Sequence, residues 1–445
     1  YVAEEYNLDY IPAGCALYTL YDETGESRYR KAIETLEEQL RHQPRTPCGS
    51  FWHKGIYPNQ VWLDGLYMGL PFHAAYALRF GDAATLDDIM LQFRNARKYL
   101  YNEKTGLYYH AWNETKDVFW ADPKTGLSQN FWTRAIGWYL MAMADIYAML
   151  PDSRADLQKE LAALWKEAID GMLRWQEPDS GLFYQLPALP DVKGNYLETS
   201  GSLMVAYSLL KGARLGVLAE PKYRAAGEKI LVGIELRKFT VHDGKVELHG
   251  ICKGAGLGPA GNLRRNGTVE YYLSEDVVHD EQKGVGVCMM AYAEYAAGMA
   301  FSNAGLGMVH AMAHALGGRY NLPHGVCNAV LLPYVLEYNG AAPEARIRFE
   351  KIAKAIGLEE AAGQTTAAYG SSSDTRTVST VIEAVRHLSR QVGIPQSLSL
   401  LEPVKTEDFR ILAELAMKDT CMADNAVRPT LQEVIQVYHH AYQGR

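Results

Sequence analysis

Apolar and polar positions follow two alternating patterns along the first two thirds of the chain. In one pattern apolar residues recur on one side of a helical repeat, over residues 27–43, 84–100, 154–175 and 221–236. In the other, apolar residues lie nearly all round, over residues 13–21, 62–79, 135–149, 201–211 and 284–295. A one-sided helix belongs at the surface, whereas a helix that is apolar on every side belongs inside the fold. The alternation therefore predicts inner helices that alternate with outer ones.

Turns join each inner helix to the outer helix that follows it. They recur at Gly25, Gly81, Asp152 and near Leu218, at intervals of 56, 71 and 66 residues. Such intervals are expected for a helical hairpin plus a long loop. We therefore predict an all-α fold, a toroid of the (α/α)6 barrel type whose loops gather where the inner helices begin. Five inner helices are counted, so we expect the ring to lack its first hairpin.

A separate helical domain is predicted from residue 297 onward. Residues 297–310 are rich in small side chains, and the rest of the chain is helical with proline or glycine stops. The expected domains are therefore 1–296 and 297–445. Residues 248–267 contain six glycines but no following Lys-Ser/Thr pair, which favours a rim loop over a phosphate-binding loop. Residues 363–377, rich in Ser, Thr and Gly, are also expected to form a loop.

Composition narrows the function classes. A net charge of −8 without a basic run argues against a nucleic-acid or anionic-membrane partner. Six cysteines without a CxxC pair favour reduced thiols and a cytoplasmic location, and neither a signal peptide nor a long apolar span is found. The 29 tyrosines and 8 tryptophans suggest a cleft that stacks on ring-shaped ligands, with core packing as the alternative for about half of them.

Polar and aromatic groups gather in the loops that precede the inner helices. Asp64 lies between Leu63 and Gly65, where desolvation is expected to raise its pKa and let it hold a proton near neutral pH. Asp9 supplies a second carboxylate. The remaining candidates are His53, Lys54, His110, Trp132, Arg134 and Trp138. Of these, the two cations suit a substrate carboxylate and the two tryptophans suit sugar rings.

Each candidate also has a purely structural explanation. Asp9 taken alone fits a helix N-cap. Trp132 and Trp138 are six residues apart, so they fall on different sides of a helix and at least one of them is free to pack inside. His110 alone fits a hydrogen-bonded or exposed histidine. The catalytic interpretation rests on the convergence of these groups at one end of one toroid.

The order and spacing of these motifs resemble a known family. Residues 53–68, 109–112 and 130–138 resemble the signature of glycoside hydrolase family 105, the unsaturated rhamnogalacturonyl hydrolases, and the similarity extends over residues 1–296. The resemblance implies an (α/α)6 barrel without a cofactor that acts on oligosaccharides ending in a 4,5-unsaturated galacturonyl residue linked to rhamnose. By this resemblance Asp64 is the general acid and base and Asp9 a second active-site acid. The matching substrate-binding positions are His53, Lys54, His110, Trp132, Arg134 and Trp138.

Three histidines stand close together in the second domain. His310 and His314 are one helical turn apart, and His324 follows ten residues later. Such a group suits a divalent metal, although the side chains could instead hydrogen-bond in a polar core. The segment resembles the C-terminal helical domain of iron-containing alcohol dehydrogenases, which implies that His310 and His324 are two metal ligands and that His314 is a nearby active-site histidine.

The resemblance to the dehydrogenases is incomplete. That family also needs an Asp-x-x-x-His helix and a Gly-rich nucleotide domain, and residues 1–296 contain neither pattern. We therefore expect a vestigial iron or zinc site with weak or no binding, and no dehydrogenase activity. An NAD(P)-dependent alcohol dehydrogenase and an inactive chimeric product are the alternatives to the hydrolase. Two families that share a short join at 289–295 favour a recombined or misassembled reading frame over an evolved bifunctional enzyme.

Overall fold

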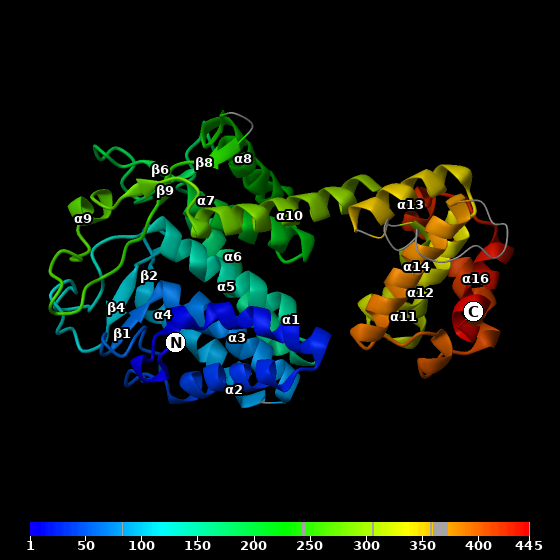
Figure 1. The fold of residues 1–445 in the computed structure, drawn as a ribbon, viewed down its shortest axis with the longest axis horizontal. Coiled ribbons are helices and arrows are strands. Elements are labelled where there is room, and N and C mark those ends of the chain that lie inside the picture. The colour runs from blue at the N-terminus through cyan, green and yellow to red at the C-terminus, as the bar shows by residue number, and fades with distance from the viewer. Residues whose placement is uncertain (82, 243–244, 305–306, 357, 359–372, 445) are drawn as a thin grey trace. The chain divides into compact units, whose positions relative to one another are not determined.

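The chain divides into two compact units. A computed structural model describes residues 1–81, 83–242, 245–304, 307–356, 358 and 373–444. Unit 1 is Tyr1–Gly298 and unit 2 is Met299–Arg445. Each unit has its own apolar core, that of unit 1 built on the long helices and that of unit 2 on a smaller helical bundle (Figure 1).

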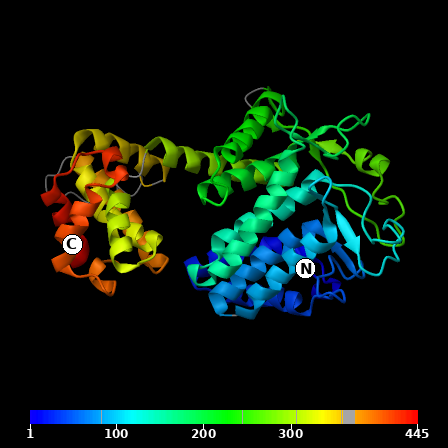
Figure 2. The ribbon, with the colours of Figure 1, turned by 180° about the vertical axis from the view of Figure 1, so that it is seen from behind.

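The predicted inner helices of unit 1 are present. They are α1 (Cys15–Thr24), α3 (Leu63–Phe80), α5 (Thr133–Met149), α7 (Thr199–Arg214) and α10 (Gln282–Ala304). Because α3, α5 and α7 pack against one another in series, they are buried nearly all round (Figure 2). The mostly helical architecture of unit 1 confirms the predicted all-α, α/α-barrel type of fold.

The outer helices follow the inner ones as predicted. They are α2 (Ser27–His42), α4 (Ala83–Leu100), α6 (Ala155–Leu173) and α8 (Pro221–Arg237). Turns join the helices of each pair, and Gly25 and Gly81 adopt positive φ values of 67° and 85° there, which glycine tolerates without strain. The amphipathic pattern thus places one apolar stripe of each outer helix on the inner layer.

The first and last helices of this row differ from the prediction. In α1 only Tyr18 is buried, while Ala16 and Leu20 are exposed. In α10 Ala291 is buried, but Met289 is 70% exposed. The expectation that both helices are buried all round is therefore wrong: α1 packs mainly against α2, whereas α3, α5 and α7 pack against one another in the interior.

Short antiparallel strand pairs form within the loops of unit 1. The pairs are β1 (Gln60–Trp62) with β4 (Ala111–Asn113), β2 (Tyr101–Asn102) with β3 (Leu107–Tyr108), β5 (Phe183–Tyr184) with β6 (Leu197–Glu198), β7 (Phe239–His242) with β8 (Lys245–Leu248), and β9 (Ile251–Cys252) with β10 (Val277–Val278). The short helix α9 (Val269–Leu273) follows an irregular stretch over 253–268. These pairs fix the loops that carry the polar candidates.

Unit 2 is a bundle of short helices. They are α11 (Gly307–Tyr320), α12 (His324–Gly340), α13 (Pro343–Ala355), α14 (Ser373–Gln391), α15 (Phe409–Ala416) and α16 (Leu431–Gln443), with the 3-10 turn η8 (Thr420–Asp424) between the last two. Of the loop expected over 363–377, residues 363–372 lie outside the described ranges. Residues 373–377 begin α14 instead, since Ser and Asp favour helix starts. Within the described ranges we find no helix long and apolar enough to cross a membrane.

Candidate active site

The pairing of β1 with β4 brings Asp64 and His110 together. In this register Trp62 lies opposite Ala111, and the Leu63 backbone N–H donates to the His110 carbonyl at 2.9 Å. Asp64, in the first turn of α3, therefore faces the residue that precedes β4. Its Oδ2 lies 3.1 Å from Nε2 of His110. The His110 side chain is fully buried and that of Asp64 is 13% exposed.

Tyr272 contacts the other nitrogen of the His110 ring. Its hydroxyl lies 2.6 Å from Nδ1 of His110, and burial raises the pKa of Tyr272 well above its ordinary value, so the phenol keeps its proton. A hydroxyl that donates to Nδ1 leaves Nε2 as the ring position that carries a proton toward Asp64. Tyr272 is 162 residues from His110 in the sequence, and no sequence pattern predicted its role.

The pKa of Asp64 moves in the direction opposite to the prediction. Burial opposes ionisation of this carboxyl, but the imidazoles of His110 and His53 outweigh burial and hold the pKa of Asp64 below its ordinary value of 3.8. The expected rise is wrong because the apolar neighbours in sequence are not the groups that surround the carboxylate. In the ligand-free protein Asp64 is ionised at neutral pH.

Asp9 lies beside His53 and Lys54. Its carboxylate contacts Nζ of Lys54 at 2.6 Å and Nε2 of His53 at 3.4 Å. The N-cap explanation for Asp9 fails, because Asn7 caps this 3-10 turn and accepts the Asp9 backbone N–H. Burial lowers the pKa of His53, although Asp9 opposes the change. His53 is therefore a mostly neutral imidazole at neutral pH, in contact with Asp9 and within electrostatic range of Asp64.

Close packing holds His53 in this position. A Cβ atom added at Gly65 would lie 3.1 Å from Nδ1 of His53, so the residue after Asp64 has little room for a side chain. The ring of Trp62 stacks on His53 with centroids 4.4 Å apart and meets His110 edge-on at 5.5 Å. Leu257, from the Gly-rich loop, is buried in the cluster around Trp62. That loop therefore forms part of the wall of the site.

Arg134 is a buried cation that forms no ion pair with a carboxylate of the residues that the structure describes. Its side chain lies at the start of α5 and is 2% exposed. Nη1 donates to the Cys252 carbonyl, and it lies 3.4 Å from Oγ of Ser200. Nε is buried without a hydrogen-bond partner, and among the described residues Arg134 forms no ion pair. A buried, incompletely satisfied guanidinium suits a carboxylate supplied by a ligand.

The two predicted tryptophans occupy different places. Trp132 is 1% exposed, lies 4.8 Å from the His110 ring and donates its indole N–H to Gln185 at 3.0 Å. Trp138 stacks instead on Tyr67, with centroids 4.7 Å apart. The six-residue spacing thus separates them as expected, with Trp132 beside His110 and Trp138 on another turn of the helix.

Family comparison agrees with this geometry. Residues 2–298, two thirds of the chain, match the sequence model of Glycosyl Hydrolase Family 88. The chain belongs to glycosyl hydrolase family 88.

Individual relatives of this family 88 chain support the assignment. The structure of a glycoside hydrolase of family 105 from C. acetobutylicum ATCC 824 is similar, with 43% identity, a TM-score of 0.64, and coverage of 67% of this chain and 82% of that one. A "24.9 kDa protein in picA locus" from Rhizobium radiobacter is 39% identical over 231 residues, which are 51% of this chain and 97% of that protein. A possible GH105 member from Klebsiella pneumoniae, 24% identical with a TM-score of 0.55 over 65% of this chain and 71% of that one, shares the fold.

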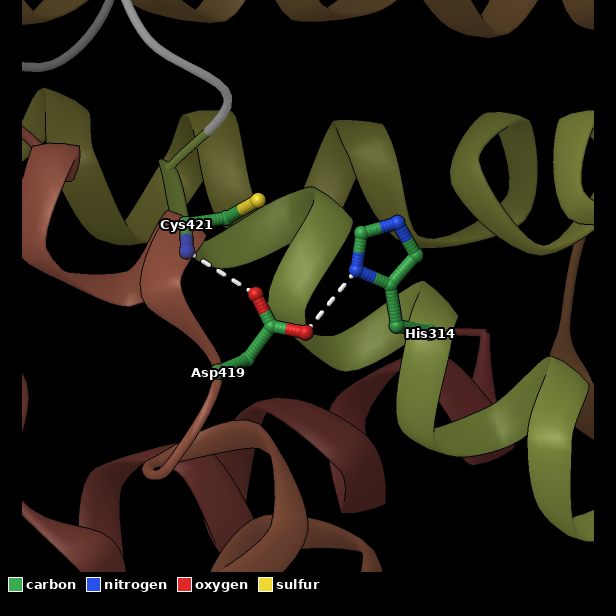
Figure 3. A group of neighbouring side chains, drawn as sticks. All are labelled: His314, Asp419 and Cys421. Carbon is green, nitrogen blue, oxygen red and sulfur yellow. Dashed lines mark hydrogen bonds and ion pairs between the residues drawn. The ribbon is translucent and has the colours of Figure 1, made fainter.

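The histidines of unit 2 form a second polar group in this family 88 chain. The ring of His324 stacks on that of His314 with centroids 5.0 Å apart and lies 5.4 Å from that of His310. Nδ1 of His314 contacts Oδ2 of Asp419 at 2.9 Å, and the Asp419 carboxylate also accepts the backbone N–H of Cys421 (Figure 3). Asp419 therefore contacts one of the three histidines, His314.

Unit 2 matches a second family. Residues 275–442 match the sequence model of the C-terminal part of the Fe-containing alcohol dehydrogenases, and the two family matches share residues 275–298. Alcohol dehydrogenase 4 from Saccharomyces cerevisiae is 47% identical over 154 residues, which are 35% of this chain but only 36% of that enzyme. This family 88 chain thus spans about a third of the length of the dehydrogenase.

The residues of unit 2 do not fit the iron site implied by the dehydrogenase family. Of the metal ligands that the dehydrogenase family needs, the resemblance assigns two to this chain, His310 and His324. Among the described residues, some sets of three metal-ligating side chains have their ligand atoms close together, but neither His310 nor His324 belongs to such a set. The group in unit 2 contains His314 instead.

Proposed function

We propose that unit 1 removes the 4,5-unsaturated galacturonyl residue from rhamnogalacturonan oligosaccharides by hydrating its enol ether double bond. Membership of glycosyl hydrolase family 88 supports hydrolysis of a glycoside. The observation that carries the finer proposal is Arg134, a buried guanidinium without an ion pair among the described residues, which calls for a carboxylate on the ligand. A uronate supplies that carboxylate a few ångströms from the reacting carbons.

Asp64 is the proton donor in this proposal. The substrate is an enol ether, so protonation of C4 places positive charge on C5, where the ring oxygen stabilises it. The carboxyl of Asp64 must therefore be protonated in the bound complex. An anionic uronate beside Asp64 raises the pKa of that carboxyl, so we infer that a proton is taken up on binding. His110, whose Nε2 lies 3.1 Å from Oδ2 of Asp64, is the polar side chain beside this carboxyl.

Water completes the reaction. After C4 is protonated, the Asp64 carboxylate removes a proton from water as the oxygen adds to C5. The product is a C5 hemiketal, and when its C5–O5 ring bond breaks, C5 becomes a ketone and O5 becomes the hydroxyl of a hemiacetal at C1. This hemiacetal then collapses to a C1 aldehyde as the bond from C1 to the rhamnose oxygen breaks, and that oxygen takes the proton that the hydroxyl loses. Asp9, in contact with Lys54 and His53, is the second acid of the site in this proposal.

The experiment compares three forms of one disaccharide. The full chain is incubated with unsaturated galacturonyl-rhamnose, with its C6 methyl ester and with the saturated disaccharide, and loss of the absorbance of the conjugated double bond and release of rhamnose are followed. We expect turnover of the first, turnover of the ester slowed about 10- to 100-fold, corresponding to a lost charged hydrogen bond, and no cleavage of the third. Equal rates on acid and ester would refute the role of Arg134, and cleavage of the saturated sugar would refute the enol ether mechanism.

A dehydrogenase function is not proposed. The chain spans about a third of the alcohol dehydrogenase that it matches, and the histidines of unit 2 do not fit the iron site of that family. Whether the chain is a chimera of two misassembled genes is tested at the DNA level. Amplification of the gene from source DNA across codons 280–310 is expected to give no contiguous product if the join at 289–295 was misassembled, and a contiguous native product would exclude misassembly.

A further inference from the structure

We propose that unit 2 carries a metal site formed by His314, Asp419 and Cys421, with zinc or a similar thiophilic divalent cation as its ligand. The ligand atoms of these three side chains all lie within 4.8 Å of one another. This set is distinct from the pair His310 and His324 that the dehydrogenase resemblance implies. It also lies outside unit 1, so it is independent of the proposed hydrolysis.

Backbone structure holds two of the three groups in place. Asp419 is the N-cap of η8, and one of its oxygens accepts the Cys421 backbone N–H at 2.8 Å. The other oxygen is thereby directed at Nδ1 of His314 on α11, 2.9 Å away. Figure 3 shows the thiol of Cys421 on the same side of the Asp419 carboxylate as the imidazole. The cap therefore pre-positions the carboxylate between a nitrogen and a sulfur ligand.

The distances suit a small tetrahedral ion after a modest shift. Zinc binds nitrogen and oxygen at about 2.0–2.2 Å and sulfur at about 2.3 Å, which puts tetrahedral ligand atoms roughly 3.3–3.7 Å apart. In the structure the ligand atoms are at most 4.8 Å apart. Side-chain rotations that move them by about 1 Å would bring them to the tetrahedral spacing. Because His314 and Asp419 are 39% and 21% exposed, an ion can reach them from solvent. The fourth position is then open to water.

The chemistry of the donors selects the ion. A thiolate favours zinc, cobalt and other borderline or soft ions over magnesium, calcium and manganese. On binding, the Cys421 thiol loses its proton to solvent, and the thiolate and the Asp419 carboxylate balance the two positive charges of the ion. His314 exchanges its contact with the carboxylate for a bond to the metal.

The absorption spectrum of bound Co²⁺ tests for the metal site without an enzyme assay. The full chain is freed of metal with a chelator, and Co²⁺ is added while absorbance is recorded. A thiolate ligand is expected to give a sulfur-to-cobalt charge-transfer band in the near ultraviolet together with visible d–d bands of tetrahedral type, and added Zn²⁺ is expected to abolish both. Absence of the charge-transfer band would overturn the proposal.

Matched variants assign the ligands. Cys421→Ser is expected to remove the charge-transfer band, and His314→Ala and Asp419→Asn to weaken Co²⁺ binding at least tenfold, whereas Cys15→Ser, which changes an exposed thiol in unit 1, and His310→Ala keep the band. Asp419→Asn retains an oxygen that can cap η8, so circular dichroism separates loss of a ligand from loss of folding. Loss of the band in His310→Ala, or its persistence in Cys421→Ser, would contradict the assignment.

Discussion

Both units contain a histidine in contact with an aspartate, but the pair is much more deeply buried in unit 1 than in unit 2. In unit 1 His110 is fully buried beside Asp64, which is 13% exposed, and in unit 2 His314 is 39% exposed beside Asp419, which is 21% exposed. Buried imidazoles and carboxylates perturb one another strongly because water screens them little, whereas exposed ones remain accessible to ions. Depth therefore separates a site suited to moving a proton from one suited to capturing a metal.

The largest expected effect tests the proton donor of unit 1. Asp64→Asn keeps the size of the side chain but removes its acid, so we expect the turnover of unsaturated galacturonyl-rhamnose to fall about 10³-fold, within the range for loss of general acid–base catalysis. The control is Asp22→Asn, which changes an exposed carboxylate that pairs with Arg79. A variant that retained a tenth of the wild-type rate would exclude Asp64 as the donor.

A pair of core substitutions tests whether the two units are independent. Leu140 in α5 and Leu316 in α11 are both fully buried, each in the core of its own unit. Truncation to alanine is expected to destabilise the unit concerned by about 2–5 kcal/mol. Thermal unfolding followed together with hydrolase activity should show Leu140→Ala inactivating the enzyme at lower temperature and Leu316→Ala leaving that temperature unchanged. Equal inactivation by both would show that hydrolysis depends on unit 2.

Substitution of Arg134 is expected to lower hydrolase activity less than substitution of Asp64. Arg134→Lys keeps the charge but loses the forked donors, so kcat/KM is expected to fall about 10- to 100-fold. The loss should appear for the free uronate and be nearly absent for its methyl ester, which steady-state kinetics on both substrates would measure. Arg97→Lys, at a surface pair with Glu167, serves as the matched control. An equal loss on acid and ester would mean that Arg134 acts only in folding.

Tyr272 is expected to act through His110. Tyr272→Phe removes one hydroxyl, frees Nδ1 and lets the His110 proton move away from Asp64, so we expect kcat to fall roughly three- to tenfold with little change in KM. The acid limb of the pH profile should also shift, because His110 lowers the pKa of Asp64. Tyr223→Phe, at a buried tyrosine that donates to Asp170, is the control. An unchanged pH profile would reduce Tyr272 to a packing residue.

The smallest expected effect is a pH dependence of stability. The folded-state pKa of His53 lies below 6.5, so the unfolded chain binds a proton more readily, and stability present above pH 6.5 is lost as the pH falls toward the folded pKa. His53→Gln should flatten this slope in denaturant unfolding measured between neutral and mildly acid pH. His42→Gln, at an exposed histidine, should leave the slope unchanged. A slope that survives in His53→Gln would assign the acid sensitivity to other groups.

Local patterns predicted the helices well but not the surroundings of individual groups. Apolar periodicity located every inner and outer helix of unit 1, yet it overstated the burial of α1 and α10, because burial depends on neighbours that a sequence pattern does not contain. The loop candidates Asp9, His53, Asp64 and His110 do meet. The direction of the Asp64 pKa was missed because the imidazoles of His110 and His53, which lower it, reach the carboxylate from other segments of the chain.

The most direct test of enol ether hydration by unit 1 measures two quantities in one reaction. With unsaturated galacturonyl-rhamnose and the full chain, the loss of double-bond absorbance and the appearance of free rhamnose are measured together over time. Hydration of the enol ether predicts that one rhamnose is released for each double bond lost, and that Asp64→Asn slows both by the same factor of about 10³. Release of rhamnose while the absorbance persists would contradict the proposed chemistry.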